Sequence, residues 1–286
     1  MFGRLIKHEL RATSRMIPFI FGVISLIALF HVFAGRFLGN MAAGLSLALL
    51  ILSLVAQVIL VWVMIAIRYY KSMYADEGYL TNTLPIKTSS IFRAKFLVSY
   101  FWIVISSLFT FIIAGGLILN YASLSGVETQ GVLQFLDTLI GFLGIPVSGA
   151  SLVGILLFVL LISSLCNLIT IFFSVTLGST SVFRKMGMGG PVLMYIIVYS
   201  VMQVLTLAAS FLIPFSLEMT LPTAWNIGES IQWNFVWGRG LLNMIQEPSI
   251  EGLIPLGSYL LYPFIYIPMF VISLKVVSKK KSTKLV

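Results

Sequence analysis

The chain has 286 residues, of which 59% are hydrophobic and only 9% are charged, and its mean hydropathy is +1.05. The surface of a protein with this composition could not be kept polar, which excludes a water-soluble globular domain. The formal net charge of +9 does not indicate nucleic-acid binding, because most of the basic residues are expected to face anionic lipid headgroups.

Residues 1–16 are predicted to form an amphipathic helix at the membrane interface, with basic residues on one face and mostly apolar residues on the other. The candidate interfacial residues are Arg4, Lys7, Glu9 and Arg11. Glu9 falls among the apolar positions. Either the helix is partly exposed there, or Glu9 faces protein and pairs with a basic group, because an unpaired charge facing lipid is costly. A cleaved signal peptide is disfavoured, because the apolar run that follows is too long.

Six apolar runs are long enough to cross the hydrocarbon layer, which takes about 20 residues per helix. None contains Asp, Glu, Lys or Arg, and we find no strand-like alternation, which disfavours a β-barrel. The predicted spans are 17–34, 42–67, 96–119, 152–177, 191–215 and 254–274. We therefore expect an all-α polytopic membrane protein, with residues 1–286 as a single transmembrane domain.

The distribution of basic residues predicts the topology. With six spans, 16 of the 18 Lys and Arg residues fall on one side, and only Arg36 and Arg239 fall on the other. The positive-inside rule then places both termini and the connection 68–95 in the cytoplasm. The segments 120–148 and 216–253 would lie outside.

Both outer segments have distinctive patterns. Apolar residues at helical spacing between Val132 and Leu143 predict an amphipathic helix on the outer surface. The second segment carries Trp225, Trp233 and Trp237, three of the five tryptophans. It is predicted to be either a short re-entrant or surface helical pair, or an ordinary aromatic anchor at headgroup level.

Several kinds of chemistry have no candidate residues. We find no GxxxxGK[ST] phosphate-binding loop, no HExxH, no Cys or His cluster and no Ser-His-Asp set, so we expect no enzyme activity and no cofactor on this chain. The lone Cys166 excludes a disulfide framework. His31 is expected to be an interface residue near the outer headgroups.

The deep polar residues are Gln57, Asn167 and Gln203. They are either hydrogen-bonding contacts between helices or the lining of a transport pathway. The spans hold no carboxylate, which disfavours an ion-driven transporter. Proton-gradient-dependent transport by the purified chain alone would instead favour an ion-driven transporter.

The connection 68–95 is the most polar internal segment and contains seven of the 27 charged residues. Its second half is predicted to contain a hinge or helix end at Gly78, an extended link at Thr83-Leu84-Pro85, and a capping residue of the next helix at Thr88, Ser89 or Ser90. A membrane protein that concentrates charge and aromatic residues in one cytoplasmic connection is expected to contact a soluble partner there.

This connection resembles that of the permease subunits of ABC-2-type ABC transporters. The similar residues are Asp76-Glu77-Gly78-Tyr79-Leu80, Thr83-Leu84-Pro85, Ser89 through Lys95, and Lys7-His8-Glu9-Leu10-Arg11 before the first span.

The resemblance implies a dimer of permeases with two separate cytoplasmic ATPases that bind ATP and Mg²⁺. It also implies that the connection is a coupling helix seated on the ATPase. The implied ATPase-coupling residues are Tyr74, Asp76, Glu77, Gly78, Tyr79, Leu80, Leu84 and Pro85. The alternative for the acidic pair is a solvated face of the loop.

The expected function is thus the membrane subunit of an ATP-driven exporter of an amphipathic or hydrophobic substrate in the bacterial cytoplasmic membrane. The alternative is a receptor or assembly scaffold whose connection 68–95 binds a soluble protein. A P-loop ATPase encoded next to this chain would favour the exporter.

Overall fold

The structure is a computed structural model, and it describes residues 2–75, 77, 78, 86–124, 149–180, 183, 186–220, 232–238 and 253–282. Within these residues, six helices are long and apolar enough to cross a membrane. The helices are α1 (Phe2–Thr13), α2 (Ile17–Phe37), α3 (Asn40–Tyr74), α5 (Thr88–Leu124), α7 (Gly149–Gly178), α8 (Gly189–Leu212) and α10 (Gly257–Ser282). This agrees with a polytopic membrane protein built mainly from helices.

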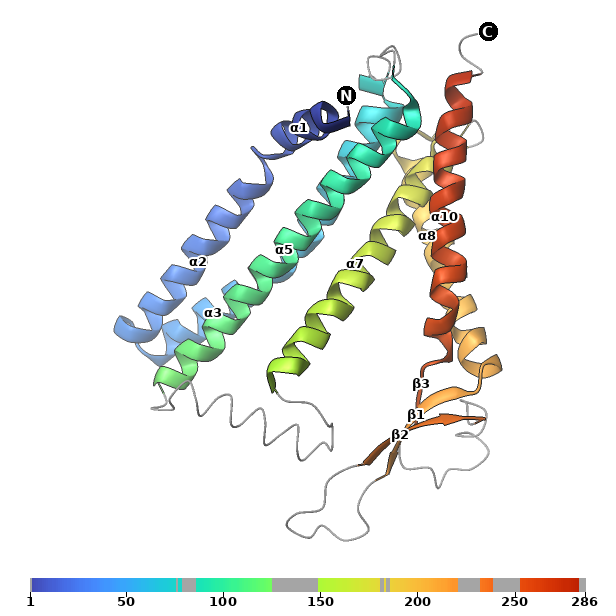
Figure 1. Ribbon diagram of the computed structural model, residues 1–286. Helices are drawn as coiled ribbons and strands as arrows, with labels where there is room; N and C mark the ends of the chain where they lie inside the picture. The colour runs from blue at the N-terminus through green and yellow to red at the C-terminus, as the bar shows by residue number, and fades with distance from the viewer. Residues whose placement is uncertain are drawn as a thin grey trace.

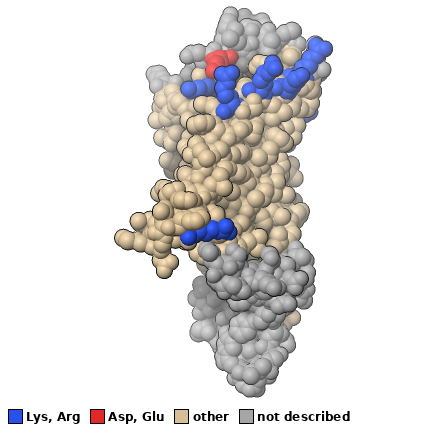
Figure 2. All heavy atoms as spheres, turned by 90° about the vertical axis from the view of Figure 1, so that its left-hand side faces the viewer, with Lys and Arg blue, Asp and Glu red and all other residues tan. Residues whose placement is uncertain are grey.

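The helices form one bundle in which α2 lies beside α3, α5 packs on α1, α3 and α7, and α10 packs on α7 and α8. The short helix α1 and the end of α10 lie at the same end of the bundle, as Figure 1 shows. Figure 2 shows that Lys and Arg side chains gather at this end. We call it the α1 end.

Helices dominate the fold, in agreement with the predicted all-α class, but three short strands that the sequence analysis did not predict lie at the opposite end (Figure 1). They are β1 (Phe215–Thr220), β2 (Gln232–Trp237) and β3 (Leu253–Pro255), and they form an antiparallel sheet in the order β2-β1-β3. The predicted helical pair in 216–253 is therefore wrong for the residues described. Phe215 to Thr220 alternate apolar and polar side chains, and this two-residue period suits a strand.

The helix limits differ from the predicted spans for identifiable reasons. The fifth span was predicted to reach residue 215, but α8 ends at Leu212. A proline disfavours helical geometry in the residue before it, and Ile213, which precedes Pro214, is extended. At the other outer segment, α5 continues to Leu124. The surface helix predicted between Val132 and Leu143 lies outside the described residues.

The buried side chains form two clusters. The larger one lies at the α1 end and joins α2, α3, α5, α7 and α10. The smaller one, Ile24, Leu50 and Leu54, joins α2 and α3 further along the bundle. Many large apolar side chains on the outer helix faces are exposed, as is expected where hydrocarbon takes the place of water.

Candidate coupling site

The two helices that flank the connection 68–95 extend beyond the predicted spans at the α1 end. Helix α3 has 35 residues, which gives a length of roughly 50 Å at 1.5 Å per residue. The hydrocarbon layer is about 30 Å thick. Helix α5 begins at Thr88, eight residues before the predicted span. The connection is therefore carried by long helices that emerge from the apolar layer.

The chain turns back on itself immediately after α3. The Gly78 N–H donates to the Ala75 carbonyl over 2.8 Å, and a Cβ on Gly78 would lie only 2.7 Å from the Met73 carbonyl oxygen. A side chain at this position would therefore collide with backbone. Gly78 was predicted to be a hinge or a helix end, and the structure places it in a helical turn where only glycine fits without a collision.

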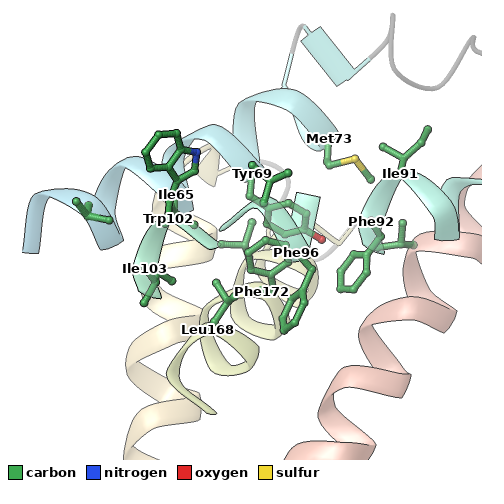
Figure 3. Close-up of a cluster of buried hydrophobic side chains, with 14 of the residues drawn as sticks. Ile65, Tyr69, Met73, Ile91, Phe92, Phe96, Trp102, Ile103, Leu168 and Phe172 are labelled. Carbon is green, nitrogen blue, oxygen red and sulfur yellow. The ribbon is translucent and has the colours of Figure 1, made fainter. Parts of the chain in front are cut away.

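An aromatic cluster joins the two flanking helices to α7 (Figure 3). The Tyr69 ring of α3 stacks on Phe172 of α7 with their centroids 4.0 Å apart, and its hydroxyl lies 2.8 Å from that of Thr176. Phe92 of α5 meets both rings edge-on. Aromatic pairs of this kind contribute about 0.5–1.5 kcal/mol each beyond their buried area, so α3 and α5 are held against the same support.

A group of three charged residues binds α1 to the same two helices. Glu9 pairs with Arg68 of α3 at 3.4 Å and also with Lys95 of α5. The Lys95 side chain is only 6% exposed. Of the two alternatives for Glu9, the structure confirms the second, in which it faces protein and pairs with basic groups. We call Glu9, Arg68 and Lys95 the charge triad.

Hydrogen bonds beside the charge triad strengthen this attachment. The Trp102 indole N–H donates to the Thr13 hydroxyl at 2.7 Å, and the Arg68 guanidinium donates to the Ala12 carbonyl at 3.5 Å. Both reach from the long helices to the C-terminal turn of α1. Helix α1 is therefore bound to the ends of both α3 and α5.

A small cavity lies next to the charge triad and is lined in part by Ser72, Ser99 and Trp102. Its volume of about 20 Å³ is close to what one water molecule needs. The cavity is too small for an organic ligand, so the charge triad is an element that joins helices and not a substrate pocket.

The predicted interfacial residues divide into two groups. Arg4, Lys7 and Arg11 are exposed, while Glu9 points into the protein. The apolar side of α1 packs on the larger cluster through Leu5, Ile6 and Leu10. Helix α1 therefore contacts the bundle through the apolar face that was expected to lie against the membrane interface.

Only three of the predicted ATPase-coupling residues fall within the described residues. Glu77 is exposed and Gly78 is buried. Tyr74 is half-buried, with its ring edge-on to that of Tyr69 at 5.8 Å. The other predicted coupling residues, Asp76, Tyr79, Leu80, Leu84 and Pro85, lie outside the described residues.

The three candidate pathway residues do not share a surface of this chain. Gln57 is fully buried in α3, and its amide donates to the hydroxyl and the carbonyl oxygen of Ser106 in α5 at 3.0 and 3.3 Å. Asn167 is exposed and donates to the Ser163 carbonyl of its own helix. Gln203 is exposed on α8. Gln57 therefore matches the alternative of a contact between helices.

We expect Gln57→Met to change the free energy of unfolding by less than about 1 kcal/mol. Among the described residues the Gln57 Oε1 atom has no hydrogen-bond partner, so the amide is only half satisfied and methionine keeps its volume. Gln57→Ala should cost about 2–4 kcal/mol, because it leaves a cavity. Unfolding in mixed micelles measures both, and equal losses would show that the amide itself matters.

His31 was expected at the outer headgroups, but its side chain is only 2% exposed. Its Nδ1 atom lies 2.9 Å from the Ser46 hydroxyl of α3. Because the two residues lie on either side of the turn between α2 and α3, this hydrogen bond fixes how the two helices meet. No set of three His, Cys, Asp or Glu side chains that could hold a metal occurs in the described part of the chain.

The chain was also compared with known proteins. Comparison with protein-family models, curated proteins and solved structures found no match.

Proposed function

We propose that this chain is the membrane-spanning permease subunit of an ATP-driven, ABC-2-like exporter, with ATP and Mg²⁺ bound by a separate cytoplasmic ATPase. The main supporting observation is the joint anchoring of the helix ends that flank the connection 68–95. Tyr69 of α3 and Phe92 of α5 share the aromatic cluster with α7. The charge triad ties the same two helices to α1.

This anchoring supports a mechanism in which ATP-driven movement of the ATPases tilts the membrane spans. Protein interiors pack at crystal-like density, so a displacement at one end of a packed helix is transmitted and not absorbed. A force on the turn at Gly78 would act on α3 and α5 together. Exposed Glu77 and its neighbour Asp76 would meet basic groups of the ATPase, and closure of the ATPases would tilt the spans.

Two further observations favour a second permease copy, or a related permease, beside this one. Asn167 and Gln203 are exposed on helices whose outer faces are mainly apolar. Exposed amides at membrane depth are better satisfied by another protein chain than by lipid. Two such surfaces flanking a pathway with few charges would suit an amphipathic or hydrophobic substrate, such as a peptide, a drug or a lipid-like molecule.

The charge reversal Asp76→Arg with Glu77→Arg tests the proposal. We expect the variant to lose co-purification with a P-loop ATPase encoded beside this chain and to lose ATP-dependent transport, because like charges would face each other across the contact. The matched control is Glu218→Arg in β1, an acidic reversal at the opposite end of the bundle. It should retain both properties.

Normal ATPase binding and transport in the double variant would reject the docking claim. Binding of a soluble protein without an ATPase domain, lost in the same double variant, would instead favour the receptor or scaffold.

A further inference from the structure

The small sheet has one apolar face and one mainly polar face. Residues directly opposite each other on paired strands point to the same side, as do residues two apart along a strand. Phe215 pairs with Trp237, and Leu217 pairs with Phe235. One face therefore carries these four apolar side chains, while the other carries Ser216, Glu218, Asn234 and Val236.

Three residues of the sheet have a burial opposite to what water would favour, although Asn234 on the polar face is exposed as expected. Ser216, in the central strand β1, is fully buried. On the apolar face, Phe235 is 72% exposed and Trp237 is 70% exposed. Phe264, an outward-facing residue of the span α10, has a similar exposure of 76%. The two strand residues are thus as open as a side chain that faces hydrocarbon.

The rings on this face lie together as one surface. Phe215 stacks on Phe235 with the ring centroids 6.1 Å apart and 6° between the ring planes. Phe215 also contacts the Trp237 ring at 5.7 Å. Full burial of a large apolar side chain is worth about 1.5–3 kcal/mol. If Phe235 and Trp237 were in contact with water, each would lose a large part of this stabilisation.

Two spans hold the sheet close to the membrane surface. Phe215 follows the end of α8 at Leu212 by three residues, a reach of at most about 10 Å. On the other side, the Leu256 N–H donates to the Phe215 carbonyl at 2.9 Å, and α10 begins at the next residue. A Cβ on Gly257 would lie 2.4 Å from the Ile213 carbonyl oxygen, so the ends of the two spans are in backbone contact.

We propose that the apolar face of the sheet, centred on Phe235 and Trp237, lies in the interfacial layer of the same bilayer that the spans cross. The partner is the phospholipid boundary between headgroups and acyl chains. Trp and other amphipathic rings favour this layer, because the ring leaves water while its polar edge stays hydrated. The surface is continuous with the membrane interface at the ends of α8 and α10, and this inference does not depend on the transport function.

Spin labelling in lipid nanodiscs tests the proposal. In a Cys166→Ala background, which removes the one native cysteine, Phe235→Cys and Asn234→Cys place a label on opposite faces of β2. The label at 235 should collide with apolar oxygen several-fold more often than with a water-soluble nickel complex. The label at 234 should show the reverse preference. Trp237→Cys gives a second position on the apolar face if Phe235→Cys does not fold.

Two results would overturn the proposal. If the labels at 234 and 235 prefer the nickel complex equally, the apolar face is open to water. If the label at 235 is shielded from both reagents, protein covers the face instead of lipid. Dipolar broadening between labels would then identify the covering protein as a second copy of this chain.

Discussion

Glu9→Gln is expected to lower the free energy of unfolding by about 3 kcal/mol or more. The substitution removes the negative charge that pairs with Lys95, whose side chain is only 6% exposed, and with Arg68. Removing one partner of a buried ion pair costs about 3–5 kcal/mol, because the remaining charge is left in an environment that solvates it poorly. Denaturant-induced unfolding in mixed micelles measures the loss. Hydrogen exchange should rise first in α1, which the charge triad attaches to the bundle.

A double variant separates the charge pairing from other effects of the substitution. Lys95→Met removes the buried cation, so adding it to Glu9→Gln should restore most of the lost stability. The matched control is Arg11→Gln, a charge removed from an exposed position of the same helix, and it should change stability by less than about 0.5 kcal/mol. Equal effects of Glu9→Gln and Arg11→Gln would contradict the assignment of Glu9 to a buried ion pair.

The six spans could be predicted because many apolar residues along each run contribute independently to its preference for the membrane. Each apolar run is about 20 residues long and free of charge, and lipid permits few structures other than a helix. The ends were less predictable, because a helix continues into water for as long as local geometry allows. Helix α3 continues seven residues beyond the predicted limit of 67 and ends where the turn at Gly78 begins.

The sheet was missed although its pattern is present in the sequence. From Phe215 to Thr220, every second residue is polar, which is the period of a strand. The tryptophans were interpreted instead by their preference for headgroup level, and that preference says nothing about secondary structure. Strand pairing also joins Ser216 to Val236 and to Pro255, contacts between distant segments that local periodicity cannot reveal.

The charge triad was only half predictable. Glu9 stood out because it interrupts an apolar face, and of the two alternatives given for it, pairing with a basic group is the one that the structure confirms. Its partner Lys95 was not identified from the sequence. The position of Lys95 relative to nearby aromatic residues could have identified it. One face of α5 carries Phe92, Lys95, Phe96 and Trp102, and all four are buried. A lysine within an inward-facing aromatic stripe predicts an internal ion pair.

The second large effect is expected at the contact between α7 and α8. Gly178 ends α7, and a Cβ there would lie 2.6 Å from the Gly190 carbonyl oxygen and from Pro191. A Cβ on Gly190 would lie 2.4 Å from the Gly178 carbonyl oxygen. Both collisions are with backbone, so the helices would have to separate. We expect Gly178→Ala and Gly190→Ala each to cost about 3 kcal/mol, the upper end for overpacking.

Gly154→Ala, in the same helix as Gly178, is the matched control, because a Cβ at this position would meet nothing within 4 Å. It should be neutral or stabilising by up to about 1 kcal/mol, since alanine is the better helix former. The Gly178→Ala and Gly190→Ala double variant should cost less than the sum of the single changes, because both relieve their collisions by the same separation of the helices. Unfolding in mixed micelles measures all four variants. If Gly178→Ala is as mild as Gly154→Ala, α7 and α8 are not in backbone contact; strict additivity would mean that the two glycines act at separate contacts.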